Sequence, residues 1–101
     1  MTSVKAADGS TVQKVTITNG PSRAQLISYG ATLMEFRLDG ISYPLALGSP
    51  DPKSYFGKMR YFGAIVGPIA NRIAQGQAPL DGQSLKLAVN ENGNALHGGA
   101  D

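Results

Sequence analysis

The stretch ATLMEFRLDG, residues 31–40, carries the clearest structural pattern in the chain. Its apolar residues alternate with charged ones, so an extended backbone would place the apolar side chains on one face of a sheet and the charges on the other. The apolar set is Met34, Phe36 and Leu38, and the charged set is Glu35 and Arg37. Asp39-Gly40 then suits a two-residue hairpin turn, because both central positions of that turn need positive φ. This stretch therefore predicts a β-strand that leads into a hairpin.

The residues before this strand show the same kind of pattern. Apolar and polar residues alternate in VQKVTITNG (residues 12–20), and the pair Asn19-Gly20 at its end predicts a turn. RAQLISYG (residues 23–30) predicts a second strand, which ends at a glycine. Two strands joined by a turn are therefore expected before residue 31.

The residues after the first hairpin turn fit more than one assignment. ISYPLAL (residues 41–47) predicts a returning strand, although Pro44 lacks an amide donor and favours an edge or a bulge. Residues 48–60 predict a loop with one helical turn. The apolar YFGAIVG (residues 61–67) fits either a buried strand or a packed connector.

A second hairpin is predicted in QAPLDGQSLKLAVN, residues 77–90, with its turn at Asp81-Gly82. Leu85, Leu87 and Val89 should share one face of it, and the residues that follow predict a loop. No segment shows a sustained helical period, and about six strands are expected in all. Nothing caps the last hairpin, so the pattern predicts an all-β meander or a piece of a sandwich rather than a closed unit.

Composition limits the class of protein. The chain has 101 residues, of which 42% are hydrophobic and 16% charged, as is typical of one globular domain or part of one. The absence of cysteine excludes disulfides and thiolate metal sites, and a single histidine cannot build a multi-histidine metal site. The sequence shows no signal-peptide core and no apolar run near the roughly 20 residues of a membrane span. We therefore expect a soluble cytoplasmic protein with no membrane partner.

The net charge of +2 is spread thinly, and the nearest thing to a basic cluster lies in residues 53–62. Lysine and arginine alternate there with tyrosine and phenylalanine, a combination that can bind single-stranded nucleic acid by stacking and phosphate contact. A loop that enters a strand explains the same residues more simply. We therefore expect no nucleic-acid partner.

Two segments hold the candidate site residues, since the sequence has neither a Gly-x-Ser-x-Gly elbow nor a phosphate-binding glycine loop. GPIANRI (residues 67–73) contains Arg72, whose planar guanidinium can bind vicinal hydroxyls or carboxylates. A surface arginine or an internal ion pair is its simpler explanation. NENGNALHGG (residues 90–99) contains His97, which can exchange a proton near neutral pH, among asparagines that can bond sugar hydroxyls. The alternative there is a turn with left-handed asparagines and an exposed histidine.

Taken in order, these segments resemble the N-terminal third of the aldose 1-epimerases, the galactose mutarotase family. The motifs are Ala-Asn-Arg-Ile at 70–73, Leu-Asp-Gly at 80–82 and Asn-Ala-Leu-His-Gly-Gly at 94–99. Residues 28–40 and 47–64 also look similar to the family. The resemblance implies an all-β fold, the N-terminal part of a large twisted antiparallel β-sandwich. Residues 1–101 would then be a partial domain that stops after the Leu-His-Gly-Gly motif.

The resemblance also implies an activity. Members of this family interconvert the α and β anomers of hexoses such as galactose or glucose by acid–base ring opening, without a metal or other cofactor. By resemblance Asn71, Arg72 and His97 bind the substrate, and His97 has an auxiliary, substrate-positioning role. The family's principal acid, a second histidine, and its base, a glutamate, would lie downstream of residue 101. We therefore expect these residues alone to be inactive, and to self-associate through unpaired strand edges.

One departure from the family pattern is Pro68, which stands where the family usually has arginine. This change removes a donor near the site and stiffens the backbone. Three other functions stay open: a carbohydrate-binding module without catalysis, a hexose 6-phosphate 1-epimerase relative, and a structural module that does not use the motifs. The interpretation as a sugar site requires Arg72 and His97, far apart in sequence, to converge on one pyranose.

Overall fold

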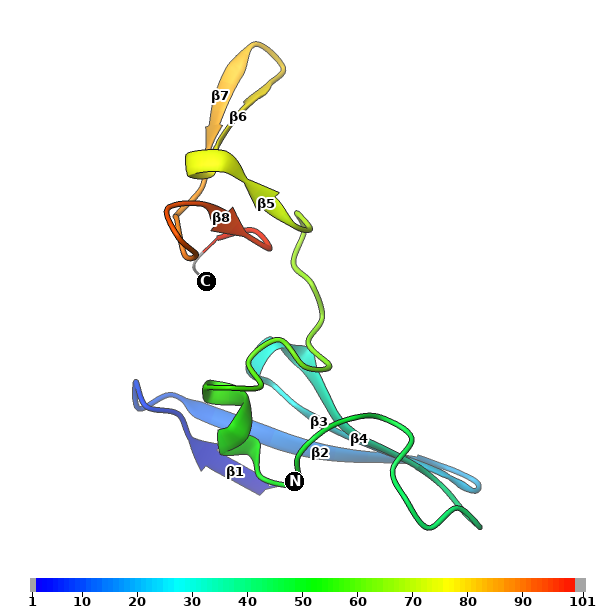
Figure 1. The fold of residues 1–101 in the computed structure, drawn as a ribbon. Coiled ribbons are helices and arrows are strands. Elements are labelled where there is room, and N and C mark those ends of the chain that lie inside the picture. The colour runs from blue at the N-terminus through cyan, green and yellow to red at the C-terminus, as the bar shows by residue number, and fades with distance from the viewer. Residues whose placement is uncertain (1, 100–101) are drawn as a thin grey trace. The chain divides into compact units, whose positions relative to one another are not determined.

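The computed structural model describes residues 2–99. The chain divides into two compact units, Met1–Ile65 and Val66–Asp101, which are described here one at a time (Figure 1). Strands and short 3-10 helices make up the regular structure, and the described residues contain no α-helix. Within that range, no helix is long and apolar enough to cross a membrane.

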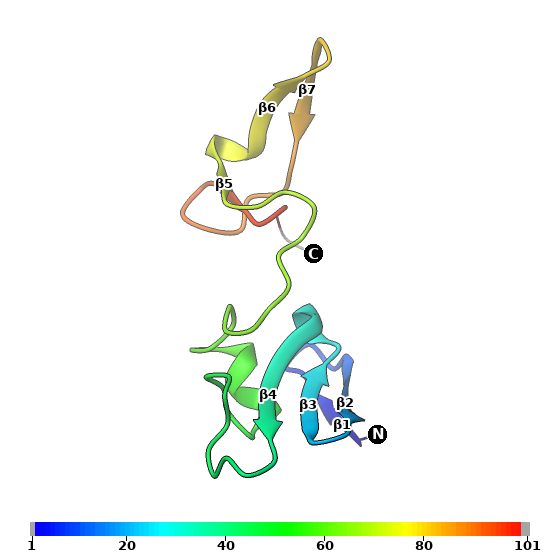
Figure 2. The same ribbon diagram turned by 90° about the vertical axis from the view of Figure 1, so that its right-hand side faces the viewer.

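The first unit is built on a four-stranded antiparallel sheet (Figure 2). The strands lie side by side in chain order: β1 (Thr2–Lys5), β2 (Thr11–Asn19), β3 (Ser22–Ile27) and β4 (Thr32–Leu38). The three strands predicted from alternation are confirmed, but β3 ends early, where the 3-10 helix η1 (Tyr29–Ala31) begins. The sequence patterns did not predict β1, because a four-residue edge strand is too short to show a period.

The two predicted turns of this sheet differ in outcome. Asn19 still pairs with Ser22, so the turn between β2 and β3 is Gly20-Pro21, one residue later than predicted. Gly20 has a φ of 54°, which glycine adopts without strain. A turn is present at Asp39-Gly40, since the Ile41 N–H donates to the Leu38 carbonyl at 3.1 Å, but only Gly40 has a positive φ, of 82°, and no strand returns from it, so it is not the predicted hairpin turn.

A β-bulge divides the apolar residues of β4 that the sequence placed on one face. The pairing of β3 with β4 shifts between Gln25 and Leu26, so that Met34 is an extra residue in the ladder. Met34 packs in the core, whereas Phe36 lies opposite Ala24 and in the same cross-strand row as Ile17. Directly opposed residues share a face, so Phe36 lies on the face of Ile17. Met34 packs with Val12, which lies an odd number of positions from Ile17 in β2 and so points to the other face. Met34 and Phe36 therefore lie on opposite faces of the sheet. The prediction of a single apolar face for β4 is therefore wrong.

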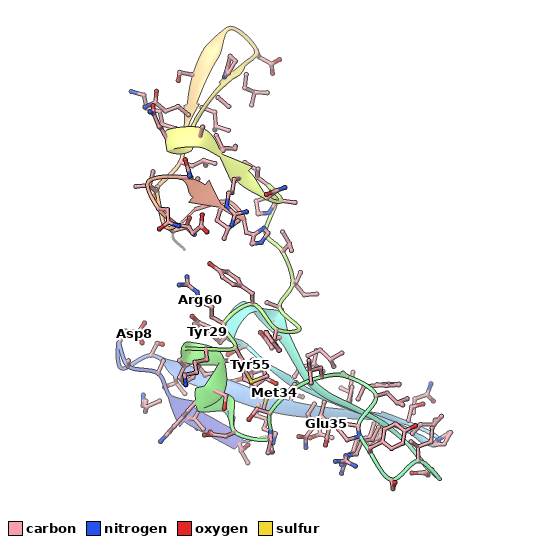
Figure 3. All side chains as sticks on the ribbon, viewed as in Figure 1. Asp8, Tyr29, Met34, Glu35, Tyr55 and Arg60 are labelled. Atoms are coloured by element: carbon pink, nitrogen blue, oxygen red, sulfur yellow. The ribbon has the colours of Figure 1, made fainter. Side chains whose placement is uncertain are left out.

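The core of the first unit lies where the 3-10 helix η2 (Pro52–Phe56) packs on the sheet (Figure 3). Its buried side chains are Val12, Ile27, Met34 and Tyr55. The Tyr55 hydroxyl accepts the Ser49 N–H at 2.8 Å, which ties the loop before η2 to the core. The predicted loop with one helical turn at residues 48–60 is thus confirmed.

Two other predictions for the first unit have different outcomes. Residues 41–47 form no strand, since after the turn only the Leu45 N–H bonds to β4, at the Phe36 carbonyl. Residues 61–67 form no buried strand but a connector that is held to the first unit: the Leu33 N–H donates to the Gly63 carbonyl and the Ile65 N–H donates to the Gly30 carbonyl, each at 2.9 Å. Their large side chains are exposed, with Ile65 at 70%.

The second unit contains the predicted second hairpin, formed by β6 (Gln77–Leu80) and β7 (Gln83–Lys86). Its turn residues Asp81 and Gly82 have φ values of 50° and 77°, as a two-residue turn of the primed type requires. The expected apolar face is shorter than predicted. Leu85 and Leu87 are half-buried, but β7 ends at Lys86 and Val89 is exposed.

The segment after residue 90 was predicted to be a loop, but part of it forms a strand. β5 (Arg72–Ile73) pairs antiparallel with β8 (Ala95–Leu96), so residues from the two candidate motifs lie on neighbouring strands (Figure 1). The 3-10 helix η3 (Ala74–Gly76) follows β5 and leads into β6. This short ladder brings the Ala-Asn-Arg-Ile and Leu-His-Gly-Gly motifs together.

Candidate functional site

Asn71 and His97 are joined by two hydrogen bonds just beyond the β5–β8 ladder. The His97 N–H donates to the Asn71 carbonyl at 2.9 Å, and the Asn71 N–H donates to Nδ1 of the His97 ring at 3.1 Å. Both residues have positive φ, 65° for Asn71 and 52° for His97. Such backbone conformations are unfavourable for residues other than glycine, and they persist where surrounding contacts hold them.

This contact selects one tautomer of the neutral imidazole ring. A backbone N–H can only donate, so Nδ1 of His97 must be the unprotonated acceptor. The neutral ring then carries its hydrogen on Nε2, and its second nitrogen is a donor. In this state His97 can donate a hydrogen bond to a ligand oxygen, and its ring orientation is set by the Asn71 backbone.

Arg72 forms an ion pair with Glu91, a residue that was not among the predicted site residues. Nε of Arg72 donates to Oε2 of Glu91 at 2.9 Å, and Nη2 donates to Oε1 at 2.8 Å. This fork-to-fork geometry is the strongest form of a charged hydrogen bond. The hydrogen bonds from Arg72 lower the pKa of Glu91 from its ordinary value; burial opposes them, and the charge of Arg72 lowers the pKa further by a lesser amount. The simpler explanation for Arg72, an ion pair within the fold, is thus correct for the Nε and Nη2 side of its guanidinium.

The asparagines of the 90–99 segment serve the backbone. Asn90 holds both sides of the His97 loop: its Nδ2 donates to the carbonyls of Leu96 and Gly99, each at 3.0 Å, and its Oδ1 accepts the Leu96 N–H at 2.7 Å. Oδ1 of Asn94 accepts the Gln75 N–H at 3.2 Å. The predicted left-handed turn is present at Asn92, with a φ of 48°. The asparagines therefore position the site, whereas the sequence offered them as possible sugar ligands.

Pro68 lies beside the same loop. A Cβ on Gly98 would come within 3.8 Å of Cδ of Pro68, and a Cβ on Gly67 would come within 3.0 Å of the His97 carbonyl. The segment that carries Pro68 therefore packs closely against the backbone of His97 and Gly98. The side chain at position 68 borders the candidate site, as the resemblance implied.

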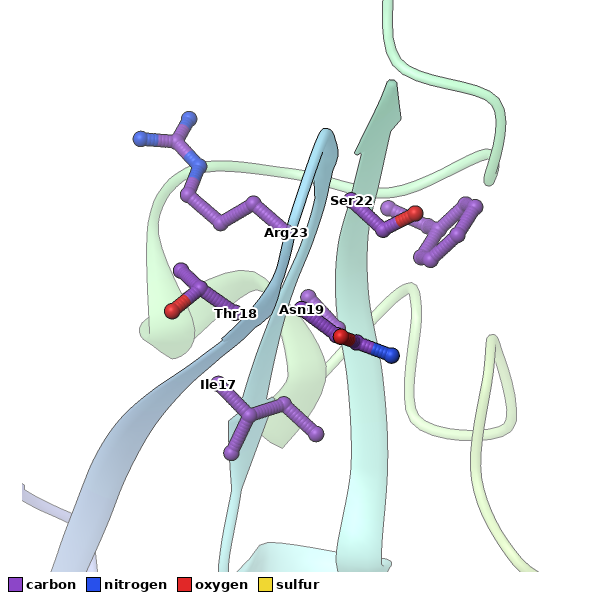
Figure 4. Close-up of a pocket in the computed structure, with 7 residues that line it drawn as sticks. Ile17, Thr18, Asn19, Ser22 and Arg23 are labelled. Atoms are coloured by element: carbon purple, nitrogen blue, oxygen red, sulfur yellow. The ribbon is translucent and has the colours of Figure 1, made fainter. Parts of the chain in front are cut away.

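Other features of the described residues do not add to this site. A shallow hollow of about 130 Å³ lies at the β2–β3 hairpin of the first unit (Figure 4). It is lined by Ile17, Thr18, Asn19, Ser22, Arg23, Ala24 and Phe36, and contains no candidate residue. Residues 2–99 hold no group of three histidine, aspartate or glutamate side chains placed to bind a metal ion. In the basic stretch, Tyr55 is buried and its ring is thus unavailable for stacking on a base.

Comparison with known proteins identifies the family. Residues 13–101 match the family model described as aldose 1-epimerase. The chain is 41% identical over 92 residues to galactose mutarotase of Sus scrofa, covering 88% of this chain and 27% of that protein. It is 33% identical over 100 residues to aldose 1-epimerase of Escherichia coli K12, covering 95% of this chain and 29% of that protein.

A solved structure agrees with these matches. Galactose 1-epimerase from Lactobacillus acidophilus NCFM is similar with a TM-score of 0.73 and 28% identity, over 97% of this chain and 29% of that one. The chain thus spans less than a third of the length of these relatives, and it matches their N-terminal part. The predicted fold class, the N-terminal part of an all-β fold with antiparallel sheets, is confirmed. Because the family model matches most of this chain, the chain belongs to the aldose 1-epimerase family.

Proposed function

We propose that this chain supplies part of the hexose-binding site of an aldose 1-epimerase, with Asn71, Arg72 and His97 at the sugar. The observation that carries the proposal is the pair of hydrogen bonds between Asn71 and His97. These bonds join the two family motifs and orient the one imidazole of the chain. A pre-oriented donor suits a substrate whose oxygens must be held in one position during reaction.

Each of the three residues has a distinct role in the proposal. The Nε2–H of His97 donates to a sugar oxygen close to the ring oxygen. The end of the Arg72 guanidinium donates to vicinal hydroxyls, which its planar fork matches in geometry. Asn71 acts mainly through its backbone, which sets the ring of His97 and the start of β5.

Anomer exchange also needs a base and an acid. The base removes the proton of the C1 hydroxyl while the acid protonates the ring oxygen, so that the ring opens, the C1 carbon rotates, and the ring closes on its other face. In the geometry described here Nδ1 of His97 is occupied by the Asn71 N–H, which suits an auxiliary, positioning role better than that of the principal acid. Glu91 is engaged by Arg72 and is not placed as a base. We therefore expect these residues alone to bind hexose without catalysing mutarotation.

The substrate class follows from the relatives. Two of those reported above are a galactose mutarotase and a galactose 1-epimerase, and a maltose epimerase of Levilactobacillus brevis is 38% identical over 91 residues. That match covers 87% of this chain and 27% of the L. brevis protein. Galactose and maltose are therefore sugars to test, and the family resemblance adds glucose to them.

Binding can be measured by titrating each sugar into the isotope-labelled chain and recording amide shifts by NMR. The proposal expects saturable shifts at Asn71, Arg72 and His97, and none at Thr16 in the first unit. A His97→Gln variant should lose the shifts. Equal shifts in the variant and the parent chain, or no saturable shift with any of the three sugars, would show that this is not a sugar site.

Activity is a separate measurement. Polarimetry on freshly dissolved α-galactose or α-glucose should show no acceleration by the chain. Substantial acceleration that disappears in His97→Gln would mean that these residues contain the acid and the base, and would refute the auxiliary role.

A further inference from the structure

We propose that Glu91 is a positioning residue of the sugar site, which holds the guanidinium of Arg72 in the plane in which it meets the substrate. This inference rests on the proposed function, because it gives Glu91 its role through Arg72. No motif in the sequence pointed to Glu91. The structure shows it as the partner of the arginine.

The geometry of the pair fixes the guanidinium rather than merely attracting it. Glu91 accepts from Nε and Nη2 of Arg72, which lie along one side of the planar group, at 2.9 Å and 2.8 Å. Two parallel bonds define both the direction and the plane of the fork, whereas a single bond defines only a distance. The remaining N–H groups of Arg72 belong to the end of the fork, and that end is the edge suited to a pair of vicinal hydroxyls.

Glu91 is itself held by the loop that leads to His97. The N–H groups of Asn90 and Glu91 donate to the Asn94 carbonyl at 3.0 Å and 3.1 Å, and the Asn94 N–H donates to the Glu91 carbonyl at 2.8 Å. Asn92 and Gly93, with φ values of 48° and 78°, form the turn between them. The carboxylate therefore projects from a closed turn, and its backbone is tied to the segment that carries His97.

The pair also affects the charge of the site. Half of the Arg72 side chain is exposed, at 52%, and the carboxylate offsets its positive charge. A site that offers donors with little net charge suits a neutral hexose better than a hexose 6-phosphate. Loss of the carboxylate should therefore weaken the binding of a neutral sugar and strengthen the binding of an anionic one.

The test uses the full chain and the variants Glu91→Gln, Arg72→Lys and the double variant. Glu91→Gln keeps the shape of the side chain and removes its charge. The matched control is Glu35→Gln, which breaks another arginine–carboxylate contact, with Arg23 and Arg37, in the first unit. The Nε–H resonance of Arg72 is recorded by NMR in each protein with that arginine, and affinities for galactose, glucose and glucose 6-phosphate are measured by the same titration.

In the parent chain we expect a sharp, exchange-protected Nε–H resonance for Arg72, which is lost in Glu91→Gln and kept in Glu35→Gln. Glu91→Gln should bind the best neutral hexose about three- to tenfold more weakly and glucose 6-phosphate more tightly. In the Arg72→Lys background, Glu91→Gln should have little further effect on the neutral sugar, because Glu91 acts through the guanidinium. A general structural role would instead weaken binding of both kinds of sugar.

The outcomes separate this inference from the proposed function. If the parent chain binds hexose but Glu91→Gln binds it equally well, or the two variants act additively, the positioning role is refuted and the sugar site stands. If no hexose binds the parent chain while the Arg72 resonance still depends on Glu91, the ion pair is structural, and both the sugar site and the positioning role are refuted.

Discussion

Replacing Asn90 with alanine should release the segment that carries His97. The Asn90 side chain makes three hydrogen bonds to this segment: two from Nδ2, to the carbonyls of Leu96 and Gly99, and one from the Leu96 N–H to Oδ1. Leu96 is buried, so its N–H would lose its acceptor in a place that water does not easily reach.

The expected loss in the free energy of opening this loop follows from these contacts. A typical hydrogen bond contributes a net ~0.5–1.5 kcal/mol, and a buried donor left without an acceptor costs ~1–3 kcal/mol. Asn90 is only partly buried, so water can replace some of its bonds. We therefore expect a loss of about 2–3 kcal/mol in the free energy of opening this loop, which corresponds to roughly a 30- to 150-fold fall in protection of the Leu96 amide.

Native-state hydrogen exchange at Leu96 and His97 measures this directly. The matched control is Gln83→Ala, which removes an exposed amide side chain from β7 of the same unit and should change the free energy by less than about 0.5 kcal/mol. Because the loop orients His97, Asn90→Ala should also weaken hexose binding. Equal exchange rates for Asn90→Ala and Gln83→Ala would show that the Asn90 clamp does not stabilise the site.

Four further predictions concern stability, titration and association. Tyr55→Phe leaves the Ser49 N–H without its acceptor and should lower the free energy of unfolding in urea by about 1–3 kcal/mol; no change would mean that water takes the place of the hydroxyl. Gln75→Gly relieves an exposed residue with a φ of 54° and should raise the free energy of unfolding by about 1 kcal/mol, seen as a higher thermal midpoint; a lower midpoint would contradict this. The Glu91 carboxyl, followed by carbon-detected NMR, should titrate below its ordinary pKa and return to that pKa in Arg72→Gln. Its stabilising effect is therefore present above the pKa of the unfolded chain and is lost as the pH falls through the pKa of the folded chain. An unchanged titration in the variant would exclude the ion pair as the cause. Within the sheet, β1 pairs only with β2, so light scattering should show an average mass that rises with concentration, and a constant monomer mass up to high concentration would refute association.

Much of the first unit could be predicted because its signals are local. Alternating residues identified β2, β3 and β4, and the Asp39-Gly40 pair identified a turn in which Gly40 has a φ of 82°. The errors have local causes as well. Residues 41–47 make a single backbone bond to β4 and form no strand, and the bulge at Met34 moved Phe36 to the other face, which alternation alone cannot reveal.

The candidate site was predicted only in part. Arg72, Asn71 and His97 were singled out by the two family motifs, and the β5–β8 ladder does bring these motifs together. Glu91 was overlooked because an acidic residue in a turn normally points to solvent. The bond between the Asn71 N–H and Nδ1 of His97 could not be foreseen either, since it joins backbone and side chain across a loop.

The sequence by itself determined the strands, the primed turn at Asp81-Gly82 and the family, because these depend on neighbouring residues and on short motifs. Only the tertiary structure decided which nitrogen of His97 is an acceptor and which carboxylate holds Arg72. Both are contacts between residues far apart along the chain. They form when β5 and β8 pair and the 90–94 turn closes, and no local preference of the residues involved specifies them.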